Sequence, residues 1–572
     1  MKISRITGLL AGFLLVASFA QARVLTAELT TSSKKGNDGV AAGCAPPSEK
    51  TELDVNNVRA LIQTGGDMWW DLVGQARYEV PEGSGRNSLF AGSLWLGGQD
   101  VSGQLKVAAQ RFRSGGNDFW TGPLSTVDAE INAATCLEYD NHYVTTRNDV
   151  SQFVAWYNCQ QDPACDLATE FPEYQVPQSI LDWPAHGRDF EPYNEDYNLA
   201  PFIDRDGDNF YDPIGAGDYP AYDLFGTFDC TKRLPTVYGD KNLWWVFNDK
   251  GNIHTESGAN SIGMEIRAQA FGFSTNDEVN NMTFYNYELV NRSTFILTET
   301  YMGSWVDPDL GNAQDDFVGC DVERGLGYCF NGDEVDEDNG GAIGYGSQPP
   351  AIGVDFFQGP FQDNDGKDNC LCDDFNSALA DDGILYDGSG IGYGDDLPDN
   401  ERLGMRAFLY HNNDDSPRGD PRTGVEYYNY LRSRWRDNQR MVYGGTGRQA
   451  SVTPPYVEAD FMFPGDSDPL GWGTGGDIQP IWTEVTAGNQ PFDRRFIQSA
   501  GPFTLAPGAV NFITVGVVWA QASTGGAQAS VTAVRKADDK TQALFDACFV
   551  LIDGPDAPDI SVTELDKEII LQ

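Results

Sequence analysis

Acidic residues crowd one stretch of this chain so densely that they limit how it can fold. From Asp307 to Asp399 there are 23 Asp and Glu residues, and the only basic residues are Arg324 and Lys367. Buried carboxylates are costly unless cations or hydrogen bonds compensate them. Proteins bind calcium mainly through carboxylate and carbonyl oxygens. We therefore expect residues 307–400 to form an acidic, loop-rich insertion that calcium holds in place.

The whole chain is also strongly acidic, with a formal net charge of −47 at pH 7. A field of that sign repels nucleic acids and anionic lipid surfaces, so neither is an expected partner. Calcium ions or basic partners are the expected counterparts. The alternative is that the acidity only keeps the protein soluble.

The N-terminus has the pattern of a secretory signal peptide, residues 1–22. Lys2 and Arg5 precede an apolar run at 8–20, and Ala20-Gln-Ala22 fits the small-x-small cleavage rule. No cysteine follows the junction, which argues against a lipoprotein anchor. No later apolar run approaches the roughly 20 residues of a membrane-spanning helix. The mature protein is therefore expected to be secreted, outside the cell or on its surface, with no membrane span.

The cysteines favour disulfides. The chain has 10 Cys, all beyond the expected cleavage site, and an even count in an exported protein indicates disulfide bonds. Zinc is less favoured, because Cys370-Leu-Cys372 lacks the usual ligand spacing and the chain has only 4 His. The local pairs expected from spacing are Cys159 with Cys165 and Cys320 with Cys329.

Strand patterns dominate, which predicts a mainly β fold built of β-sandwich-type domains with long, calcium-pinned loops and few short helices. Segments 88–97 and 104–112 are expected to form a hairpin. Further strands are expected at 243–247, 264–273, 282–291, 295–306, 351–357 and 510–520. Helices are expected only at 54–63, 149–157 and 531–546.

The expected domain organisation follows these patterns and the composition of the segments between them. A flexible lead-in covers 23–50 and a β-rich region covers 51–306. The acidic insertion at 307–400 is followed by a second β-rich region at 401–555. Residues 556–572 are expected to begin a further strand or domain.

One acidic loop, 204–212, has the alternation that wraps a hard cation with oxygens. It is not an EF-hand, because Asn209 and Gly215 stand where that loop needs Gly and a bidentate Glu. It more closely resembles the calcium loops of thrombospondin-type and dockerin-like repeats. The alternative is a solvated Asp/Gly turn. The expected calcium ligands are Asp204, Asp206, Asp208, Asp212 and the carbonyl oxygen of Phe210.

Two further calcium sites are expected inside the acidic stretch. The first has the same chemistry in a shorter loop, although Asp-Gly clusters also make ordinary turns. The second would form where the chain folds back after the strand ending at Val306. The expected ligands are Asp363, Asp365 and Asp368 in the first site, and Asp307, Asp309, Asp315, Asp316 and Asp321 in the second.

Catalytic signatures are missing from the sequence. It contains no His-Glu-x-x-His zinc site, no Gly-x-Ser-x-Gly nucleophile motif and no Walker motif. The match of 471–476 to a dinucleotide-binding spacing lies in a Gly/Pro-rich loop and is read as chance. A glycosidase with two carboxylates stays open, and the 13 Trp and 24 Tyr would suit stacking on sugar rings.

Several segments together resemble large secreted surface proteins of Bacteroidota, many of which leave the cell by the type IX route. They are 89–98, 315–333, 399–405, 460–466 and 501–508, and Asp315-Asp-Phe-Val-Gly-Cys-Asp321 is the most specific. The resemblance implies a location outside the cell or on its surface, but it transfers no activity. Such proteins usually continue into further β-domains and a C-terminal sorting domain, and neither is visible after Gln572.

The sequence therefore favours an extracellular, calcium-stabilised structural or adhesive surface protein without enzymatic activity. Self-assembly through the strand expected at 560–571, or contact with other surface proteins or glycans, would fit that role. The alternative is a secreted protein that binds or hydrolyses glycans.

Overall fold

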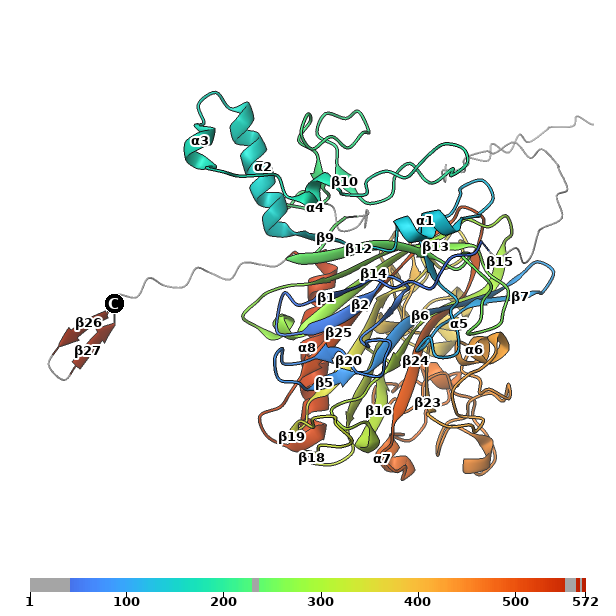
Figure 1. The fold of residues 1–572 in the computed structure, drawn as a ribbon. Helices are drawn as coiled ribbons and strands as arrows, with labels where there is room; N and C mark the ends of the chain where they lie inside the picture. The colour runs from blue at the N-terminus through green and yellow to red at the C-terminus, as the bar shows by residue number, and fades with distance from the viewer. Residues whose placement is uncertain (1–41, 229–235, 551–561, 566–567, 572) are drawn as a thin grey trace, which may run out of the picture. The chain divides into compact units, whose positions relative to one another are not determined.

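The computed structural model describes residues 42–228, 236–550, 562–565 and 568–571. The expected signal peptide, 1–22, and most of the expected lead-in, 23–50, lie outside the described residues. The predicted mainly β fold is confirmed, because two large antiparallel sheets dominate the described secondary structure (Figure 1). No described helix is both long enough and apolar enough to cross a membrane.

Sheet 1 has ten strands and joins segments from both halves of the chain. Strand β1 (Lys50–Leu53) pairs with β2, and β7 (Leu105–Ala108) pairs with β6. The main path of the sheet runs β23 (Ala407–Asn412), β24 (Arg494–Leu505), β15 (Leu297–Asp307), β6 (Ala91–Asp100), β3 (Asp67–Met68), β2 (Arg59–Gln63), β4 (Tyr78–Glu79) and β5 (Asn87–Leu89).

Sheet 2 has nine strands. Strand β9 (Tyr143–Thr146) pairs with β12 at one edge. The main path runs β16 (Asp316–Asp321), β17 (Leu326–Asn331), β20 (Ala351–Gln358), β25 (Val510–Ala520), β14 (Met282–Asn291), β13 (Met264–Gly272), β12 (Lys241–Asn248) and β8 (Trp120–Thr121). The region 307–400 is therefore not a separate insertion, because β16, β17 and β20 are integral to this sheet.

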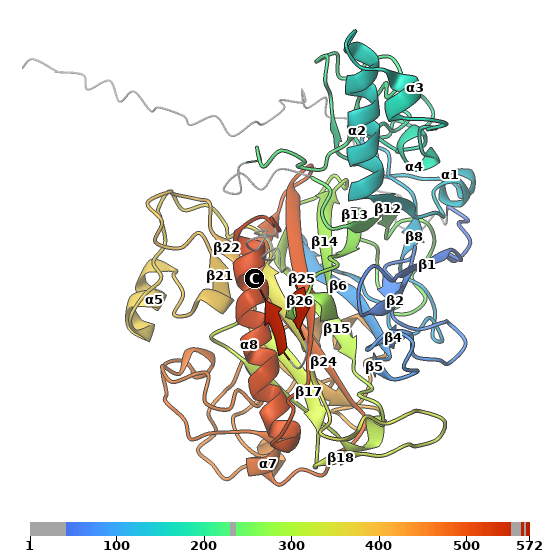
Figure 2. The ribbon, with the colours of Figure 1, turned by 90° about the vertical axis from the view of Figure 1, so that its left-hand side faces the viewer.

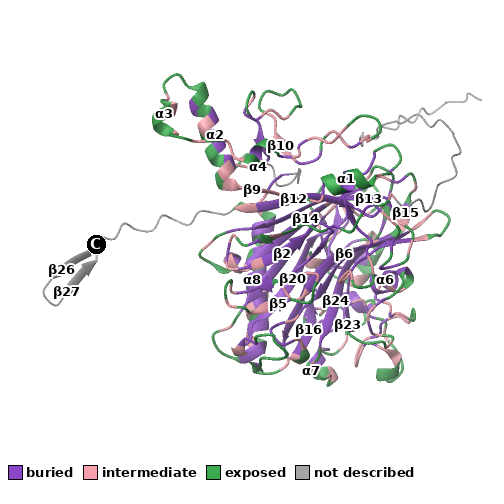
Figure 3. Cartoon of the chain, viewed as in Figure 1, coloured by how far each residue is buried: buried purple, intermediate pink, exposed green. Residues whose placement is uncertain are grey.

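The two sheets share one hydrophobic core (Figure 3). Trp69 of the sheet 1 region donates a hydrogen bond from Nε1 to the hydroxyl of Tyr285 on β14, at 2.8 Å. Both rings are almost fully buried. Burying aromatic side chains of this size supplies much of the free energy that holds two sheets together.

Helix α8 (Gly526–Asp546) covers the other face of sheet 2 (Figure 2). Val531 and Val534 of the helix face this apolar layer, and the ring of Phe545 stacks on Phe357 of β20 at 5.0 Å. The second face of sheet 2 is therefore buried too, which explains why its strands show imperfect alternation.

Helix α6 (Gly424–Tyr430) packs on sheet 1. The ring of Tyr427 lies 4.7 Å from that of Trp95 on β6. Gly97 leaves room for the neighbouring Tyr428, because a Cβ at position 97 would lie 2.8 Å from its ring.

The remaining helices are short, apart from α2. A separate cluster of side chains from α2, α4 and the following loops packs on Trp244 and Val246 of β12. The bounds are α1 (Ala133–Glu138), α2 (Arg147–Gln161), α3 (Leu167–Glu170), α4 (Gln178–Leu181), α5 (Phe375–Asp381) and α7 (Glu484–Ala487).

Four small strand pairs complete the described sheets. The strand expected at 560–571 is instead a hairpin, as far as the described residues show it. The pairs are β10 (Phe202–Ile203) with β11 (Tyr219–Pro220), β18 (Val335–Asp336) with β19 (Gly346–Ser347), β21 (Gly390–Ile391) with β22 (Arg402–Leu403), and β26 (Val562–Leu565) with β27 (Glu568–Leu571).

Most expected elements are confirmed. The predicted strands at 282–291 and 510–520 agree with β14 and β25 at both ends, and the predicted hairpin is β6 with β7. The helix predicted at 54–63 is wrong. Asn56 accepts a hydrogen bond from Val58 N in a turn, and β2 then pairs with β1 and β4. Pairing with neighbouring strands overrides the helical pattern there.

Disulfides are present, but one expected pair is wrong. The bonded pairs are Cys44–Cys136, Cys159–Cys165 and Cys370–Cys372, and Cys548 is also disulfide-bonded. Cys320 and Cys329 are free and buried. The register of β16 and β17 places Cys320 opposite Gly327 and Cys329 opposite Val318, so the two thiols are not directly paired.

Iodoacetamide is expected to leave Cys320 and Cys329 unmodified in the folded protein and to alkylate both in denaturant. Burial raises the pKa of each thiol and hides it from the reagent. Mass spectrometry of the alkylated peptides measures this. A disulfide-linked pair of peptides containing these two cysteines would contradict the structure.

Two carboxyl groups face each other beneath α8. Asp355 on β20 and Asp538 on α8 are almost fully buried. Burial first, and then mutual repulsion, raises the pKa of Asp538, and burial raises the pKa of Asp355 to about 8. The folded state therefore holds protons here that the unfolded chain releases above about pH 4.

Stability is expected to fall as the pH rises from 5 to 9, by up to about 1.4 kcal/mol per pH unit for each proton retained. Asp538→Asn should unfold at the same temperature as the wild type near pH 5 and at a higher temperature near pH 9. Thermal unfolding across this pH range tests the pair. Asp539→Asn, on the exposed side of α8, is the control. An Asp538→Asn protein less stable than wild type at pH 9 would refute the account.

Candidate metal centres and an adjoining pocket

The first group of carboxylates, here called the Asp204 group, consists of Asp204, Asp206 and Asp218. Each residue offers an oxygen within 4.8 Å of the others. The antiparallel pair β10 (Phe202–Ile203) and β11 (Tyr219–Pro220) matches Ile203 with Tyr219, so Asp204 and Asp218 lie at the same end of the pair. The sequence predicted the first two residues and missed Asp218.

Backbone hydrogen bonds hold the loop of the Asp204 group. Asp204 accepts from the backbone N–H of Gly207 and of Asn209, each at 2.7 Å, and the Asn209 bond is the first cause of the lowered pKa of Asp204. Asp218 accepts from Arg205 N and Asp212 N, both at 2.9 Å. Burial, with Asp204 and Asp206 nearby, raises the pKa of Asp218.

The other residues predicted for this loop stay outside the group. Asp208 accepts from Phe210 N at 2.8 Å, and Asp212 accepts from Gly215 N at 2.7 Å. The exposed ring of Phe210 stacks on His186 at 5.8 Å. These contacts fit an ordinary Asx turn for Asp208.

The second group, here called the Asp307 group, consists of Asp307, Asp309 and Asp493, again with oxygens within 4.8 Å of one another. Strand β15 ends at Asp307 and β24 begins at Arg494. Their register matches Val306 with Phe496, so the residues after β15 meet those before β24. The sequence predicted Asp307 and Asp309 and missed Asp493, which is far away along the chain.

Arg495 supplies the positive charge next to this group. Its Nε lies 3.1 Å from Asp307 Oδ1, and its Nη2 lies 3.6 Å from Asp493 Oδ1. Asp309 has no hydrogen bond or ion pair from its carboxylate to any described residue. Burial and the nearby Asp493 raise the pKa of Asp309 to about 7, and burial also raises the pKa of Asp307.

The same guanidinium reaches a second carboxylate network. Arg495 Nη1 lies 3.1 Å from Asp420 Oδ1, and Arg111 Nη1 lies 2.7 Å from Asp420 Oδ2. His411 Nδ1 lies 3.2 Å from Asp420, while its Nε2 accepts from Trp305 Nε1 at 3.0 Å. Because Nε2 accepts a hydrogen bond, it carries no proton, so the His411 ring is neutral. Burial lowers the pKa of His411.

Three predicted ligands, Asp315, Asp316 and Asp321, do not join the Asp307 group. Asp316 accepts from Leu310 N at 3.0 Å, and Asp321 pairs with Arg535 at 2.9 Å. Both are buried at the ends of β16. Burial and the neighbouring Asp336 raise the pKa of Asp315 to about 7.

The predicted site at 363–368 is also not assembled among the described residues. Asp363 accepts from Thr504 N at 2.6 Å, and Asp368 accepts from the backbone of Gly394 and Asp396. Asp365 accepts from Lys367 N at 2.9 Å. Only the Asp365 contact is a local turn, while Asp363 and Asp368 each bind a backbone segment farther along the chain.

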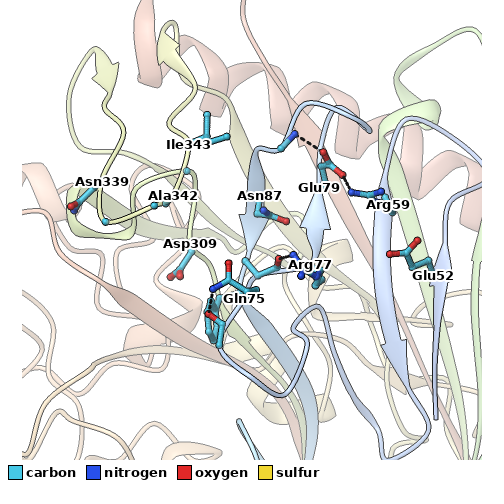
Figure 4. A pocket seen from close by; sticks show the side chains of 17 residues that line it. Glu52, Arg59, Gln75, Arg77, Glu79, Asn87, Asp309, Asn339, Ala342 and Ile343 are labelled. Atoms are coloured by element: carbon cyan, nitrogen blue, oxygen red, sulfur yellow. Dashed lines mark hydrogen bonds and ion pairs between the residues drawn. The ribbon is translucent and has the colours of Figure 1, made fainter. Parts of the chain in front are cut away.

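A pocket of about 390 Å³ adjoins the Asp307 group through Asp309 (Figure 4). Asp309 lies between the loop from Asn339 to Ile343 on one side and Gln75, Arg77 and Asn87 on the other. We call it the Asp309 pocket. The volume lies within the range of small-molecule sites, about 300–1,000 Å³.

Comparison with known proteins adds no assignment, since no protein-family model and no curated protein matches this chain. The candidate sites therefore stand on their own geometry.

Replacing Arg495 with Met is expected to destabilise the protein by about 3–5 kcal/mol at pH 7, because the change leaves buried carboxylates without their counter-charge. The loss should shrink as the pH falls from 7 to 4, because the raised pKa values of Asp307 and Asp309 let these carboxyls take up protons in that range. Denaturant unfolding at both pH values measures this. Arg422→Met removes an exposed guanidinium and is the control. An equal loss at both pH values would contradict the charge argument.

Proposed function

We propose that this protein is an extracellular, calcium-stabilised structural or adhesive protein of the cell surface, without enzymatic activity. The observation that carries the proposal is the pair of aspartate groups, each with three carboxylate oxygens within 4.8 Å of one another. Calcium is the cation suited to such oxygen-only sites, and its flexible coordination tolerates irregular loops.

The positions of the two groups support a stabilising role. The Asp204 group lies where β10 and β11 meet, and the Asp307 group lies where β15 and β24 meet. A cation at either position would tie together chain segments that are separate in sequence. A cation that binds only to the folded state stabilises that state by mass action.

Disulfides support a location outside the cytoplasm, since such bonds persist in oxidising compartments. The signal-peptide pattern and the resemblance to Bacteroidota surface proteins exported by the type IX route agree with this location.

Two histidines support a non-enzymatic role, because the ring nitrogens of each face other buried groups of the protein. Both ring nitrogens of His254 face backbone carbonyl oxygens, those of Val107 and Asp249, at 2.8 and 2.7 Å. His411 is buried between Trp305 and Asp420. Neither is placed to exchange protons with a bound substrate.

Purified protein is expected to retain about two calcium ions after dialysis, one for each group of three aspartates. A chelator should lower the unfolding temperature, since a ligand at 100 times its Kd stabilises by about 2.7 kcal/mol. Elemental analysis and thermal unfolding with and without chelator measure both effects.

Matched variants assign the ions. Asp206→Asn and Asp309→Asn should each lose one ion, while Asp365→Asn, a turn aspartate outside both groups, should lose none. Protein without bound metal, and with the same unfolding temperature in chelator, would show that the carboxylates are only solvated. Release of reducing sugars from glycans would contradict the non-enzymatic part of the proposal.

A further inference from the structure

Asp309 belongs to two features at once. Its carboxylate is one of the three in the Asp307 group, and it also lines the Asp309 pocket. Its two partners are buried behind it, with exposed fractions of 1% for Asp307 and 9% for Asp493. The group is therefore closed on the protein side and open through Asp309.

The buried oxygens of this group have few partners. Among the described residues, Asp307 Oδ1 has only Arg495 Nε beside it, at 3.1 Å, and Asp493 Oδ1 has only Arg495 Nη2, at 3.6 Å, while Asp493 Oδ2 accepts from Asn413 at 2.9 Å. The carboxylate of Asp309 makes no hydrogen bond or ion pair with a described residue. One guanidinium, which Asp420 also shares, thus faces three carboxylates. Buried oxygens of this kind require a cation or protons.

A calcium ion at this position would have an incomplete shell. Calcium takes about six to eight oxygen ligands, and three carboxylates cannot supply that number unless all of them bind through both oxygens. The remaining coordination positions would face the pocket, where water or an oxygen-bearing ligand could occupy them.

The pocket wall favours a neutral ligand over an anionic one. Its two arginines are already committed, Arg59 to Glu79 and Arg77 to Asp71. The pocket therefore offers no free positive side chain, and the chain carries a net charge of −47. An anion would meet an unfavourable field at this surface.

Amide groups line both sides of the pocket (Figure 4). The side-chain amide of Asn87 makes no hydrogen bond to a described residue, and Gln75 and Asn339 lie nearby (Figure 4). An amide donates and accepts at once, which matches a hydroxyl group. Phe90 adds an aromatic surface suited to the apolar face of a sugar ring.

We infer that the Asp309 pocket binds a neutral carbohydrate in a calcium-dependent manner. Adjacent sugar hydroxyls complete the coordination of a calcium ion held by Asp307, Asp309 and Asp493, and Asn87 hydrogen-bonds the ring substituents. This rests on the proposed function, since it requires calcium in the Asp307 group. It adds a ligand to that ion, so the adhesive role acquires a defined surface and a class of partner.

A printed array of neutral and acidic oligosaccharides, probed with the full chain in calcium and again in chelator, tests the inference. We expect binding to at least one neutral glycan and at least a tenfold loss in chelator. Asp309→Asn should abolish binding together with one bound calcium ion. Asn87→Ala should weaken binding at least tenfold while the calcium content stays unchanged.

Controls separate the possible failures. Asp365→Asn should bind glycan like the wild type, and thermal unfolding checks that each variant is folded. Because the side chain of Asn87 makes no hydrogen bond to an aspartate of the group, its variant still tests the pocket if Asp309→Asn misfolds. No calcium in the wild-type Asp307 group would overturn both the proposed function at this site and the inference. Calcium bound there without binding to any neutral glycan, or with binding unaffected by Asn87→Ala, would overturn the inference alone.

Discussion

Charge compensation in the interior is the constraint on which this structure depends. The guanidinium of Arg495 lies against Asp307, Asp420 and Asp493, and the residue is almost fully buried on β24, an interior strand of sheet 1. A buried charge without a partner costs several kcal/mol, so a chain with this excess of carboxylates can fold only where arginines or cations meet them. The same solution recurs in sheet 2, where Glu265 contacts two arginines.

Local patterns were sufficient for much of the fold. Strand β14 could be placed from its residues alone, because Tyr285, Tyr287 and Leu289 alternate with side chains on its other face. Its alternation is imperfect for a physical reason: Tyr285 faces the core between the sheets and Phe284 faces the layer under α8. The helix predicted at 54–63 failed because strand pairing outweighed its local pattern.

The candidate sites were predictable only in part. Asp204 with Asp206, and Asp307 with Asp309, stand close together in sequence and were found. Their third members lie beside the partner strand, Asp218 near in sequence and Asp493 far along the chain, and the spacing of the acidic motifs reveals neither. The strand register reveals both residues. Residue 218 continues the pairing of β10 with β11, and residue 493 continues the pairing of β15 with β24. The Cys320–Cys329 pair failed for the same reason, since their strands pair in a register that offsets the two thiols.

Strands β24 and β25 follow one another in sequence, yet each is an interior strand of a different sheet. Strand β24 joins β23 to β15, and β25 joins β20 to β14. A chain emerging from the ribosome with its N-terminus first therefore cannot close either sheet until residues 494–520 have been made. Contacts of such long range form slowly. Until then both sheets stay incomplete, so a translocation channel that took up the chain during synthesis would receive it before either sheet had formed in full.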